Sequence, residues 1–291
     1  MNLFYEEAIE RIKKFAKIAE KMNFEVTVGF SGGKDSQVVY DLCKRSGIKF
    51  VAYYNESFES NVTKQFIREN YPDVVWRRNV CGFFENIAKN HGGYLPTAES
   101  AYCCTDYKHN PKFVDDCSII GIRRAESAKR KTRKTLELKN KTQLKQNKSL
   151  VESYFSDTCV GTGTASIIQL KPIIDWSDED VWDYIKAMNL PVNPEYKQHK
   201  RVGCLICPKA RFSSNYINLM KWPKLIDCAI ASRERGQLHK DWIITSENED
   251  FSNNKAYYIC RWLNHSFRKF TKKEEKMYEI LKKEYLKLHN Q

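Results

Sequence analysis

The first stretch that could carry chemistry is the heptapeptide Phe30–Ser36, which reads Phe-Ser-Gly-Gly-Lys-Asp-Ser. Glycines let a backbone approach an anion closely, and the unpaired amides and positive dipole at a helix start attract it. Apolar, β-branched residues at 24–29 precede the heptapeptide, and residues 37–44 place their apolar side chains on one helical face. A strand, a glycine-rich turn and a helix in this order predict a phosphate-binding site. The turn is not a Walker A loop, because the spacing from glycine to Lys-Ser or Lys-Thr is missing.

The second stretch is Gly121–Ser127, which reads Gly-Ile-Arg-Arg-Ala-Glu-Ser and follows an apolar run expected to be a strand. Side chains at the carboxyl end of a parallel strand face the same crevice as the glycine-rich turn. Guanidinium groups match the oxygens of phosphate and sulfate. We therefore predict that Arg123 and Arg124 contact the anionic ligand.

The third set consists of two cysteine pairs, which are Cys103–Cys104 and Cys204–Cys207. The second pair has CxxC spacing and is followed by proline, and four thiolates can ligate one metal centre. An adjacent pair is unusual for tetrahedral zinc, which prefers spacers of two to four residues. The four cysteines could therefore bind an iron–sulfur cluster, bind zinc or be thiols without a metal, and the sequence leaves these three alternatives open. Among the other six cysteines, Cys159 stands out, because a Gly- and Thr-rich stretch near the expected crevice could make its thiol reactive.

The composition of the chain indicates its cellular compartment and the class of partner that it binds. The 291 residues carry a net charge of +13, which favours a polyanionic partner such as a nucleotide, a nucleic acid or both. No apolar run approaches the ~20 residues that span a membrane, and the first residues do not resemble a signal peptide. We therefore expect a cytoplasmic protein with no membrane partner. Its ten cysteines are then more typical of reduced, metal-binding or catalytic thiols than of disulfides.

The elements that position these residues alternate along the first two thirds of the chain. Apolar runs predict strands at 24–29, 48–54, 74–77, 117–122 and 167–174. Helical patterns lie between several of them, and the chain from Asp178 onward is almost wholly helical. The fold class expected is α/β, with a doubly wound, mostly parallel sheet and a helical C-terminal part. We place a nucleotide-binding domain at 1–210 and a helical region at 211–291.

One segment departs from this pattern. Residues 123–148 contain eleven lysines and arginines against two glutamates, which accounts for +9 of the net charge. Its second half is polar and nearly without periodicity, so we expect a basic insert at about 128–150 that is a mobile loop or exposed helix. A solvated charge run and contacts to a phosphate backbone are both open interpretations.

Several motifs resemble a known family. The loop Ser31–Ser36 is similar to the PP-loop of the adenine nucleotide α-hydrolase superfamily. The chain resembles the phosphoadenosine phosphosulfate (PAPS) reductase family at Gly121–Ser127, Leu170–Ser177, Asp180–Ile185, Pro191–Tyr196 and Arg201–Cys204, in the family's order. The resemblance covers roughly residues 24–210. Its specificity comes from the ordered set, since each motif alone is weak.

This resemblance implies an adenine nucleotide ligand and assigns residues to it. ATP would contact the loop residues Ser31, Gly32, Gly33, Lys34, Asp35 and Ser36 through its phosphates, and Tyr53 and Asn55 through its adenosine. Lys34, Arg123 and Arg124 would be catalytic. Asp35 would help hold Mg²⁺ or fix the loop.

The cysteine pattern is similar to that of iron–sulfur members of the family, the adenosine phosphosulfate (APS) reductases and the DNA phosphorothioation proteins. It implies a [4Fe–4S] cluster, with zinc as the alternative, on Cys103, Cys104, Cys204 and Cys207. Full ligation by cysteine would leave no open iron for a substrate, so the cluster would be structural or electrostatic.

The expected reaction follows from one difference between this sequence and the family's pattern. Sulfonucleotide reductases use a thiol in a C-terminal Glu-Cys-Gly-Leu-His motif, and this sequence does not contain that motif. We therefore expect an ATP pyrophosphatase that adenylates an acceptor and releases pyrophosphate, for sulfur transfer to nucleic acid, with DNA favoured. A sulfur-donor protein such as a cysteine desulfurase would be a partner. The alternatives are a PAPS or APS reductase with an atypically placed thiol, and a nucleotide-binding subunit without catalysis.

Overall fold

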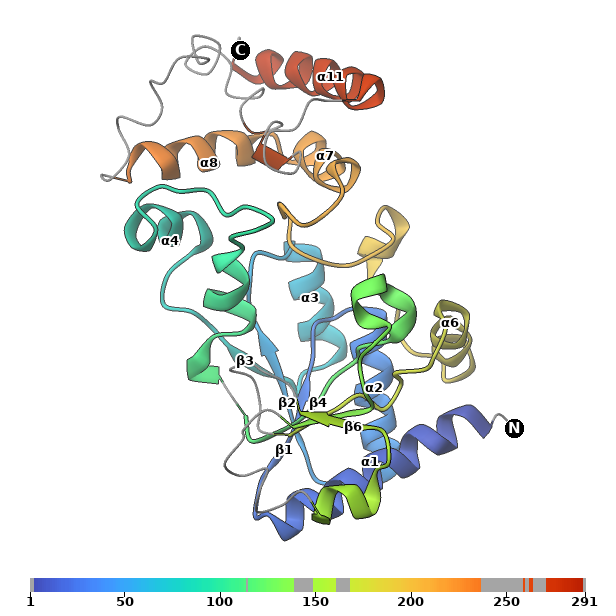
Figure 1. Ribbon diagram of the computed structural model, residues 1–291. Helices are drawn as coiled ribbons and strands as arrows, with labels where there is room; N and C mark the ends of the chain where they lie inside the picture. Colours follow the sequence, from blue (N-terminus) through green and yellow to red (C-terminus); the bar gives the residue numbers. More distant parts are fainter. Residues whose placement is uncertain are drawn as a thin grey trace. The chain divides into compact units, whose positions relative to one another are not determined.

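The computed structural model describes most of the chain (Figure 1). The described residues are 3–113, 115–138, 149–160, 168–236, 259, 262–263 and 271–289. They pack into two compact units, each assembled from separate segments. Unit 1 comprises Met1–Glu56, Asn61–Arg78 and His109–Val202, and unit 2 comprises Ser57–Ser60, Asn79–Lys108 and Gly203–Gln291. Unit 2 takes residues from both sides of position 210, and the boundary expected there stays a prediction.

Unit 1 is built on one twisted sheet. Its strands are β1 (Val26–Gly29), β2 (Val51–Asn55), β3 (Val75–Arg77), β4 (Cys117–Ile119), β5 (Leu136–Leu138), β6 (Thr158–Val160) and β7 (Ile168–Leu170). Within the described residues they lie in the order β3-β2-β1-β4-β7-β5-β6. Neighbouring strands are parallel except β5 and β7. The chain winds from β1 to one edge and then returns to β4 beside β1, which confirms a doubly wound, mostly parallel α/β sheet.

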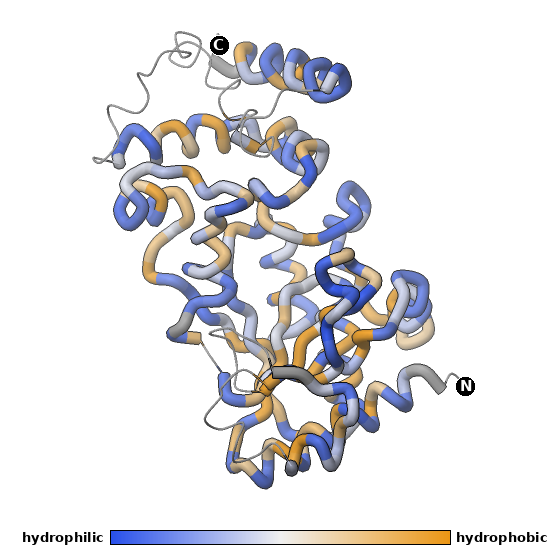
Figure 2. The backbone as a smooth tube through the Cα atoms, viewed as in Figure 1, coloured by the Kyte–Doolittle hydropathy of each residue, from blue (hydrophilic) through white to orange (hydrophobic). Residues whose placement is uncertain are grey.

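Helices cover this sheet because each has one apolar face. They are α1 (Leu3–Lys21), α2 (Lys34–Ser46), α3 (Asn61–Asn70) and α6 (Asp178–Ala187). In α1, Ile12, Phe15 and Ile18 are fully buried at helical spacing, and Figure 2 shows hydrophobic and hydrophilic residues alternating along this helix. Both α1 and α6 pack against α2. The helix that follows the glycine-rich turn is therefore held in place by two others.

Unit 2 has its own apolar core. Its main helices are α4 (Phe83–Asn90), α7 (Phe212–Lys221), α8 (Lys224–Glu234) and α11 (Lys272–His289). The helix α4 packs against α8, and α11 packs against α7. Fully buried Ile87, Leu219 and Ile226 belong to one cluster in this unit. The helical C-terminal part expected from the sequence is confirmed.

The basic segment is where sequence and structure differ most. Residues 124–126 and 128–130 form short 3₁₀ turns, and residues 136–138 form the buried strand β5. The expectation of a mobile loop or exposed helix is therefore wrong at 136–138. Leu136 and Leu138 supply the apolar surface, and Lys171, itself fully buried, pairs with Glu137 at 3.2 Å. The charge of Glu137 can be buried because it is paired. Residues 139–148 lie outside the described residues.

Two smaller findings concern the second half of unit 1. Strand β7 ends at Leu170, earlier than the predicted 174, which fits the proline at position 172, since proline donates no ladder hydrogen bond. Cys159 lies in strand β6, where the sequence suggested a loop; its side chain lies outside the described part of the structure. No helix among the described residues has both the length and the apolar character needed to cross a membrane.

Candidate functional site

The glycine-rich turn connects β1 to α2, as its sequence predicts. Gly32 has a φ of +69°, and a Cβ there would lie 2.9 Å from Cγ1 of Ile67, so a larger residue would be strained. The N-cap of α2 is Gly33, which has extended backbone angles and no side-chain cap. The amides at the start of α2 are therefore not capped by an N-cap side chain, which is the arrangement that receives an anion.

The two serines of the turn have different roles. The backbone amide of Ser31 donates to Oγ of Ser36 at 3.1 Å, and Ser36 Oγ donates to the Gly33 carbonyl at 2.8 Å. Ser36 is buried and closes the turn on itself, whereas Ser31 is exposed. Ser31 is consequently the serine whose hydroxyl can also face a ligand.

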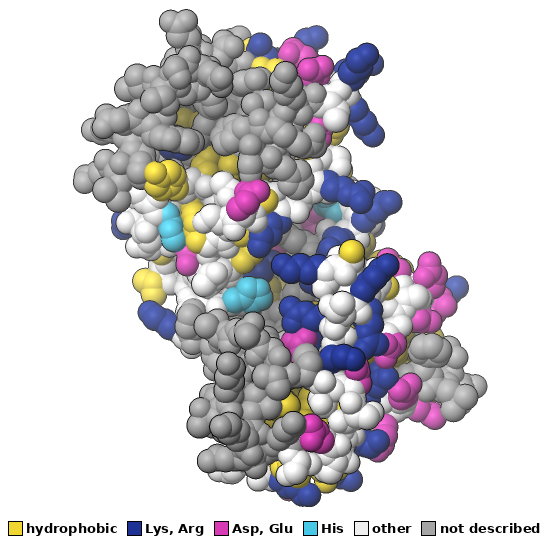
Figure 3. Space-filling model, in the orientation of Figure 1, with side chains coloured by type: hydrophobic (Ala, Val, Ile, Leu, Met, Phe, Trp, Pro, Cys, Tyr) yellow, Lys and Arg dark blue, Asp and Glu magenta, His cyan; other side chains and the backbone are white. Residues whose placement is uncertain are grey.

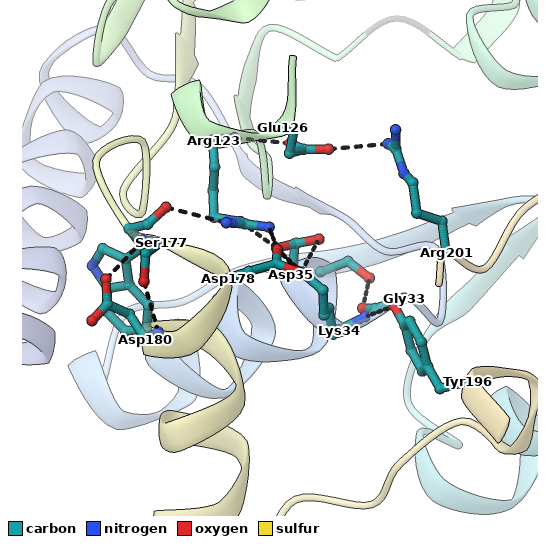
Figure 4. Close-up of polar contacts among 12 residues, drawn as sticks. Gly33, Lys34, Asp35, Arg123, Glu126, Ser177, Asp178, Asp180, Tyr196 and Arg201 are labelled. Carbon is teal, nitrogen blue, oxygen red and sulfur yellow. Dashed lines mark hydrogen bonds and ion pairs between the residues drawn. The ribbon is translucent and has the colours of Figure 1, made fainter. Parts of the chain in front are cut away.

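A segment 160 residues downstream braces the turn, and sequence reasoning missed it. Nδ2 of the fully buried Asn193 donates to the carbonyl of Gly32 at 3.0 Å and to Thr63 Oγ1 at 3.2 Å. The backbone amide of Lys34 donates to the hydroxyl of Tyr196 at 2.8 Å (Figure 4). Burial raises the pKa of Tyr196. The motif at 191–196 was the signal available, but its residue types alone did not assign a role.

Lys34 and Arg123 meet at two carboxylates (Figure 4). Nζ of Lys34 lies 2.8 Å from Oδ1 of Asp178 and 3.2 Å from Oδ1 of Asp35. The guanidinium of Arg123 lies 2.5 Å from the same oxygen of Asp35 and 2.5 Å from that of Asp178. The side chains of both cations are 5% exposed or less, so this is a buried pair of positive charges at the loop.

Asp178 was not predicted as a site residue. It stands in the first turn of α6, where an acidic residue also suits the helix dipole, so the sequence indicated only capping. Hydrogen bonds from Lys34 and then from Arg123 outweigh partial burial and lower the pKa of Asp178. Asp178 is therefore ionised and completes the charge balance at the loop.

A glycine allows Arg123 to reach this position. A Cβ on Gly121 would lie 2.7 Å from the backbone carbonyl of Asp35, too close for any side chain. The chain leaving β4 therefore packs directly against the start of α2. Glu126 then accepts from the Arg123 amide at 3.0 Å and from Arg201 at 3.1 Å, which fixes the arginine turn from the other side (Figure 4).

Arg124 does not join its neighbour. Its guanidinium donates to Asp157 at 2.8 Å and to the carbonyl of Arg133 at 2.9 Å, and it pairs with Asp175. These partners hold the segments around β5 and β7 together. The structure thus separates the two arginines, one at the loop and one in a structural network, and a catalytic role for Arg124 stays a prediction.

Tyr53 and Asn55 lie at the carboxyl end of β2. Tyr53 is the register partner of Gly29, the last residue of β1, so it stands at the sheet edge from which the loop leaves. The guanidinium of Arg77 lies 3.3 Å from the centre of the Tyr53 ring, and Asp115 holds that guanidinium with two hydrogen bonds. The adenosine contact of Tyr53 and Asn55 stays a prediction.

The four cysteines predicted to bind metal all belong to unit 2. Cys103 and Cys104 lie at the start of a short helix whose π-helical part is Cys104–Lys108. The Cys103 thiol hydrogen-bonds to Cys104, which lowers the pKa of Cys104 together with the charges of Lys209 and Lys108. The pKa of Cys103 is raised by that hydrogen bond, by burial and by the charges of the other three cysteines. The two pairs, separated by about a hundred residues in sequence, are therefore close in space.

Backbone contacts hold the second pair. The amide of Cys207 donates to Oδ1 of Asn215 at 2.9 Å, and Nδ2 of Asn215 donates back to the Cys207 carbonyl at 2.9 Å. Cys204 forms a β-bridge with Glu59, and Ser57 Oγ lies 3.7 Å from its sulfur. Nζ of Lys108 lies 3.2 Å from Glu59, so a cation is placed beside Cys204. Asn215 and the bridge to Glu59 thus fix the backbone of the second cysteine pair.

The four cysteines are the candidate metal ligands of unit 2. In the described part of the chain, no group of three or more His, Cys, Asp and Glu residues is arranged to hold one metal ion. A [4Fe–4S] cube spreads its four thiolates further apart than one zinc ion does, and it carries a negative charge that Lys108 and Lys209 would offset. A [4Fe–4S] cluster on the four cysteines stays a prediction and is taken up as a proposal in the next section.

Sequence comparison supports one family. A model of the phosphoadenosine phosphosulfate reductase domain matches residues 25–210, more than half of the chain. The adenosine 5'-phosphosulfate reductase of Lysinibacillus sphaericus is 24% identical over 212 residues, covering 68% of this chain and 79% of that protein. Adenosine 5'-phosphosulfate reductase 2 of Bacillus subtilis is 26% identical over 198 residues, covering 65% of this chain and 72% of that protein.

Two further matches differ in extent. An uncharacterized protein of Methanocaldococcus jannaschii is 27% identical over 210 residues, 68% of this chain, and the chain spans 45% of that protein's length. Among solved structures, the phosphoadenylyl-sulfate reductase from Candida auris, in a phosphate complex, matches with a TM-score of 0.44 and 14% identity. That match covers 65% of this chain and 87% of the Candida auris chain.

Proposed function

The chain belongs to the phosphoadenosine phosphosulfate reductase family, whose members are enzymes, and we propose that it is an ATP-dependent member that adenylates an acceptor and releases pyrophosphate. The observation that carries the proposal is the pair of buried cations, Lys34 and Arg123, at the start of α2, whose N-cap Gly33 provides no side-chain cap. Two cations beside helix amides suit a polyphosphate, whose leaving pyrophosphate gains negative charge as the bond to the α-phosphorus breaks.

The residues divide the substrate between them. The backbone amides of residues 32–36, apart from the Lys34 amide that donates to Tyr196, and the ammonium of Lys34 hold the β- and γ-phosphates, and Arg123 orients the α-phosphate. An acceptor oxygen attacks the α-phosphorus, the bond from that phosphorus to the bridging oxygen breaks, and the acceptor proton passes to solvent. Mg²⁺, when bound, would neutralise charge on the pyrophosphate, and Asp35 would help to hold it or would fix the loop.

The cysteine cluster is a second part of the proposal. Cys103, Cys104, Cys204 and Cys207 would hold a [4Fe–4S] cluster, with zinc as the alternative metal. Because all four iron positions would be taken by cysteine, the cluster supplies structure or charge, and no chemical step is assigned to it.

Nucleic acid, with DNA favoured, is the acceptor proposed, and a sulfur-donor protein such as a cysteine desulfurase would then supply the sulfur that displaces AMP. Figure 3 shows lysine and arginine side chains gathered over the part of unit 1 that carries the short turns after Arg123. Most of these charges are already paired: Arg130 with Glu126, Arg133 with Glu137, and Lys134 with Asp157. Lys129 and Lys131 are exposed, and within the described residues no ion pair is recorded for either. They are the cations best placed for phosphate contacts.

A second candidate is sulfonucleotide reduction, which the relatives named adenosine 5'-phosphosulfate reductase favour. In that reaction the same loop would hold the phosphate of the sulfonucleotide, and a thiol would take up the sulfate sulfur. It requires a thiol reductant and neither ATP nor a nucleic-acid acceptor.

One assay separates the candidates. Pyrophosphate release from ATP is measured without acceptor, with DNA and with tRNA, and sulfite release from adenosine 5'-phosphosulfate is measured with a thiol reductant. Our proposal expects acceptor-stimulated pyrophosphate release, lost in Lys34→Ala and kept in Lys44→Ala, since Lys44 lies on the same helix but pairs with Asp73. Sulfite release without ATP would establish the second candidate. Nucleotide binding without either product would instead indicate a nucleotide-binding subunit.

A further inference from the structure

The two cations at the loop share one carboxylate that is unlike the rest of the site. Oδ1 of Asp178 receives both Lys34 Nζ, at 2.8 Å, and an Nη of Arg123, at 2.5 Å. The Asp178 side chain is 62% exposed, whereas the side chains of Lys34 and Arg123 are 5% and 2% exposed. The exposed carboxylate of Asp178 thus pairs with the buried cations Lys34 and Arg123 at the glycine-rich turn (Figure 4).

A charge count shows what this carboxylate does. Lys34 and Arg123 carry two positive charges, and Asp35 and Asp178 carry two negative charges, so the four groups are neutral together. Without Asp178 the remaining three would carry one net positive charge beside the amides of α2. A buried net charge of this kind is costly unless an anion pairs with it, and a phosphate oxygen is the anion that the loop is shaped to receive.

Of the two carboxylates, only Asp178 is free to leave. Asp35 is 20% exposed on its side chain and belongs to the first turn of α2, under the chain that leaves β4 at Gly121. Asp178 reaches the cations from the start of α6, with most of its side chain in solvent. A rotation of the Asp178 side chain would expose both cations and leave Asp35 in place.

The start of α6 does not depend on Asp178. Ser177 Oγ accepts from the Asp180 amide at 3.0 Å, and the Asp180 carboxylate accepts from the Ser177 amide at 2.7 Å. This reciprocal capping box satisfies the helix start by itself. Release of Asp178 therefore changes the charge at the loop without unwinding α6.

We propose that Asp178 is a built-in competitor for the nucleotide, a carboxylate that occupies the phosphate position on Lys34 and Arg123 and is displaced when a polyphosphate binds. The inference rests on the proposed function in that it takes the loop as the nucleotide site. It assigns to Asp178 the control of affinity: the empty site keeps its cations paired, and the ligand must outcompete a tethered anion. Asp178 is thus a residue that sets specificity for ligands with more than one phosphate charge.

The test is direct binding of ATP and of inorganic pyrophosphate, by calorimetry on the full chain, to wild type and to Asp178→Asn. Removal of the competing charge should tighten both ligands by about tenfold or more, the factor that corresponds to one charge-assisted hydrogen bond. Glu179→Gln is the matched control, because Glu179 is exposed in the same turn of α6 and carries the same charge. It should change affinity less than about twofold. Asp178→Glu, which restores the charge, should return affinity to near the wild-type value.

Two results would overturn the inference. Weaker binding in Asp178→Asn would show that Asp178 positions the cations for the ligand, and equal tightening in Asp178→Asn and Glu179→Gln would show a general charge effect. The readout is separate from the reaction. Tighter pyrophosphate binding in Asp178→Asn, with no pyrophosphate release from ATP in any acceptor assay, would support the competitor and reject the proposed function alone.

Discussion

The loop in unit 1 and the cysteine cluster in unit 2 balance their charges in opposite ways. At the loop, the cations Lys34 and Arg123 are matched by Asp35 and Asp178, so the site is neutral and hydrogen-bonded without a ligand. At the cluster, four thiols stand together, and each negative charge raises the pKa of a neighbour such as Cys103. The loop is therefore preorganised by its own side chains, whereas the four cysteines would be held together by the proposed metal centre.

The largest expected effect tests whether the loop depends on one arginine. Arg123→Ala removes a cation whose side chain is 2% exposed and leaves Asp35 and Asp178 facing Lys34 alone. We expect turnover to fall by about 10²-fold or more, as for loss of one preorganised charge donor, and stability to fall by about 3 kcal/mol. Pyrophosphate release and urea unfolding measure the two effects.

Arg124→Ala is the matched control for that experiment. Its ion pairs with Asp157 and Asp175 are partly exposed, so we expect a stability loss of about 1 kcal/mol and less than tenfold loss of turnover. Equal loss of turnover in both variants would restore the sequence-based prediction that the arginines act as a pair.

The second prediction concerns the four cysteines of unit 2. An anaerobic preparation should be brown and contain about four irons per chain, the content of a [4Fe–4S] cluster. Cys204→Ser should lose the iron and lower the melting temperature, because metal binding and folding are coupled. Cys228→Ser, an exposed cysteine of the same unit, should lose neither. Zinc bound in a fixed ratio to the wild-type chain, in place of iron, would contradict the proposed iron–sulfur cluster.

A third, smaller effect concerns the brace of the loop. Asn193→Ala removes the buried donor to the Gly32 carbonyl and Thr63. We expect a loss of about 1–3 kcal/mol in stability, because a buried acceptor loses its partner, and about tenfold weaker ATP binding through a less ordered turn. A variant with unchanged ATP affinity would show that the loop holds its shape without this brace. Calorimetry and thermal unfolding give both values.

The smallest effect concerns the exposed lysines. Replacement of Lys129 and Lys131 together by glutamate should weaken DNA binding and reduce the slope of log affinity against log salt by about 2, one for each lost phosphate contact. ATP binding in the absence of DNA should not change. Lys134→Glu is the control, since Lys134 is already paired with Asp157. An unaltered salt slope would place the nucleic-acid contacts elsewhere.

Local sequence patterns predicted the helices and strands better than the contacts between distant side chains. The helix Leu3–Lys21 can be recognised in the sequence because its apolar residues repeat at helical spacing along its whole length. The strand at 136–138 was missed because it is three residues long and lies among charges. Its glutamate pairs with Arg133, a neighbour four positions away, and with the distant, fully buried Lys171. The contact with Lys171 is long-range, and a local pattern does not contain it.

The sequence by itself determined the chemistry of the loop. A strand, two glycines and a helix start lie next to one another in the chain, so their geometry follows from local backbone preferences. Only the tertiary structure decided that Arg123 faces Lys34 while Arg124 turns away, and that Asp178 covers both cations. The physical reason is that these contacts join side chains 33 or more residues apart, whose meeting depends on how the sheet and its helices pack.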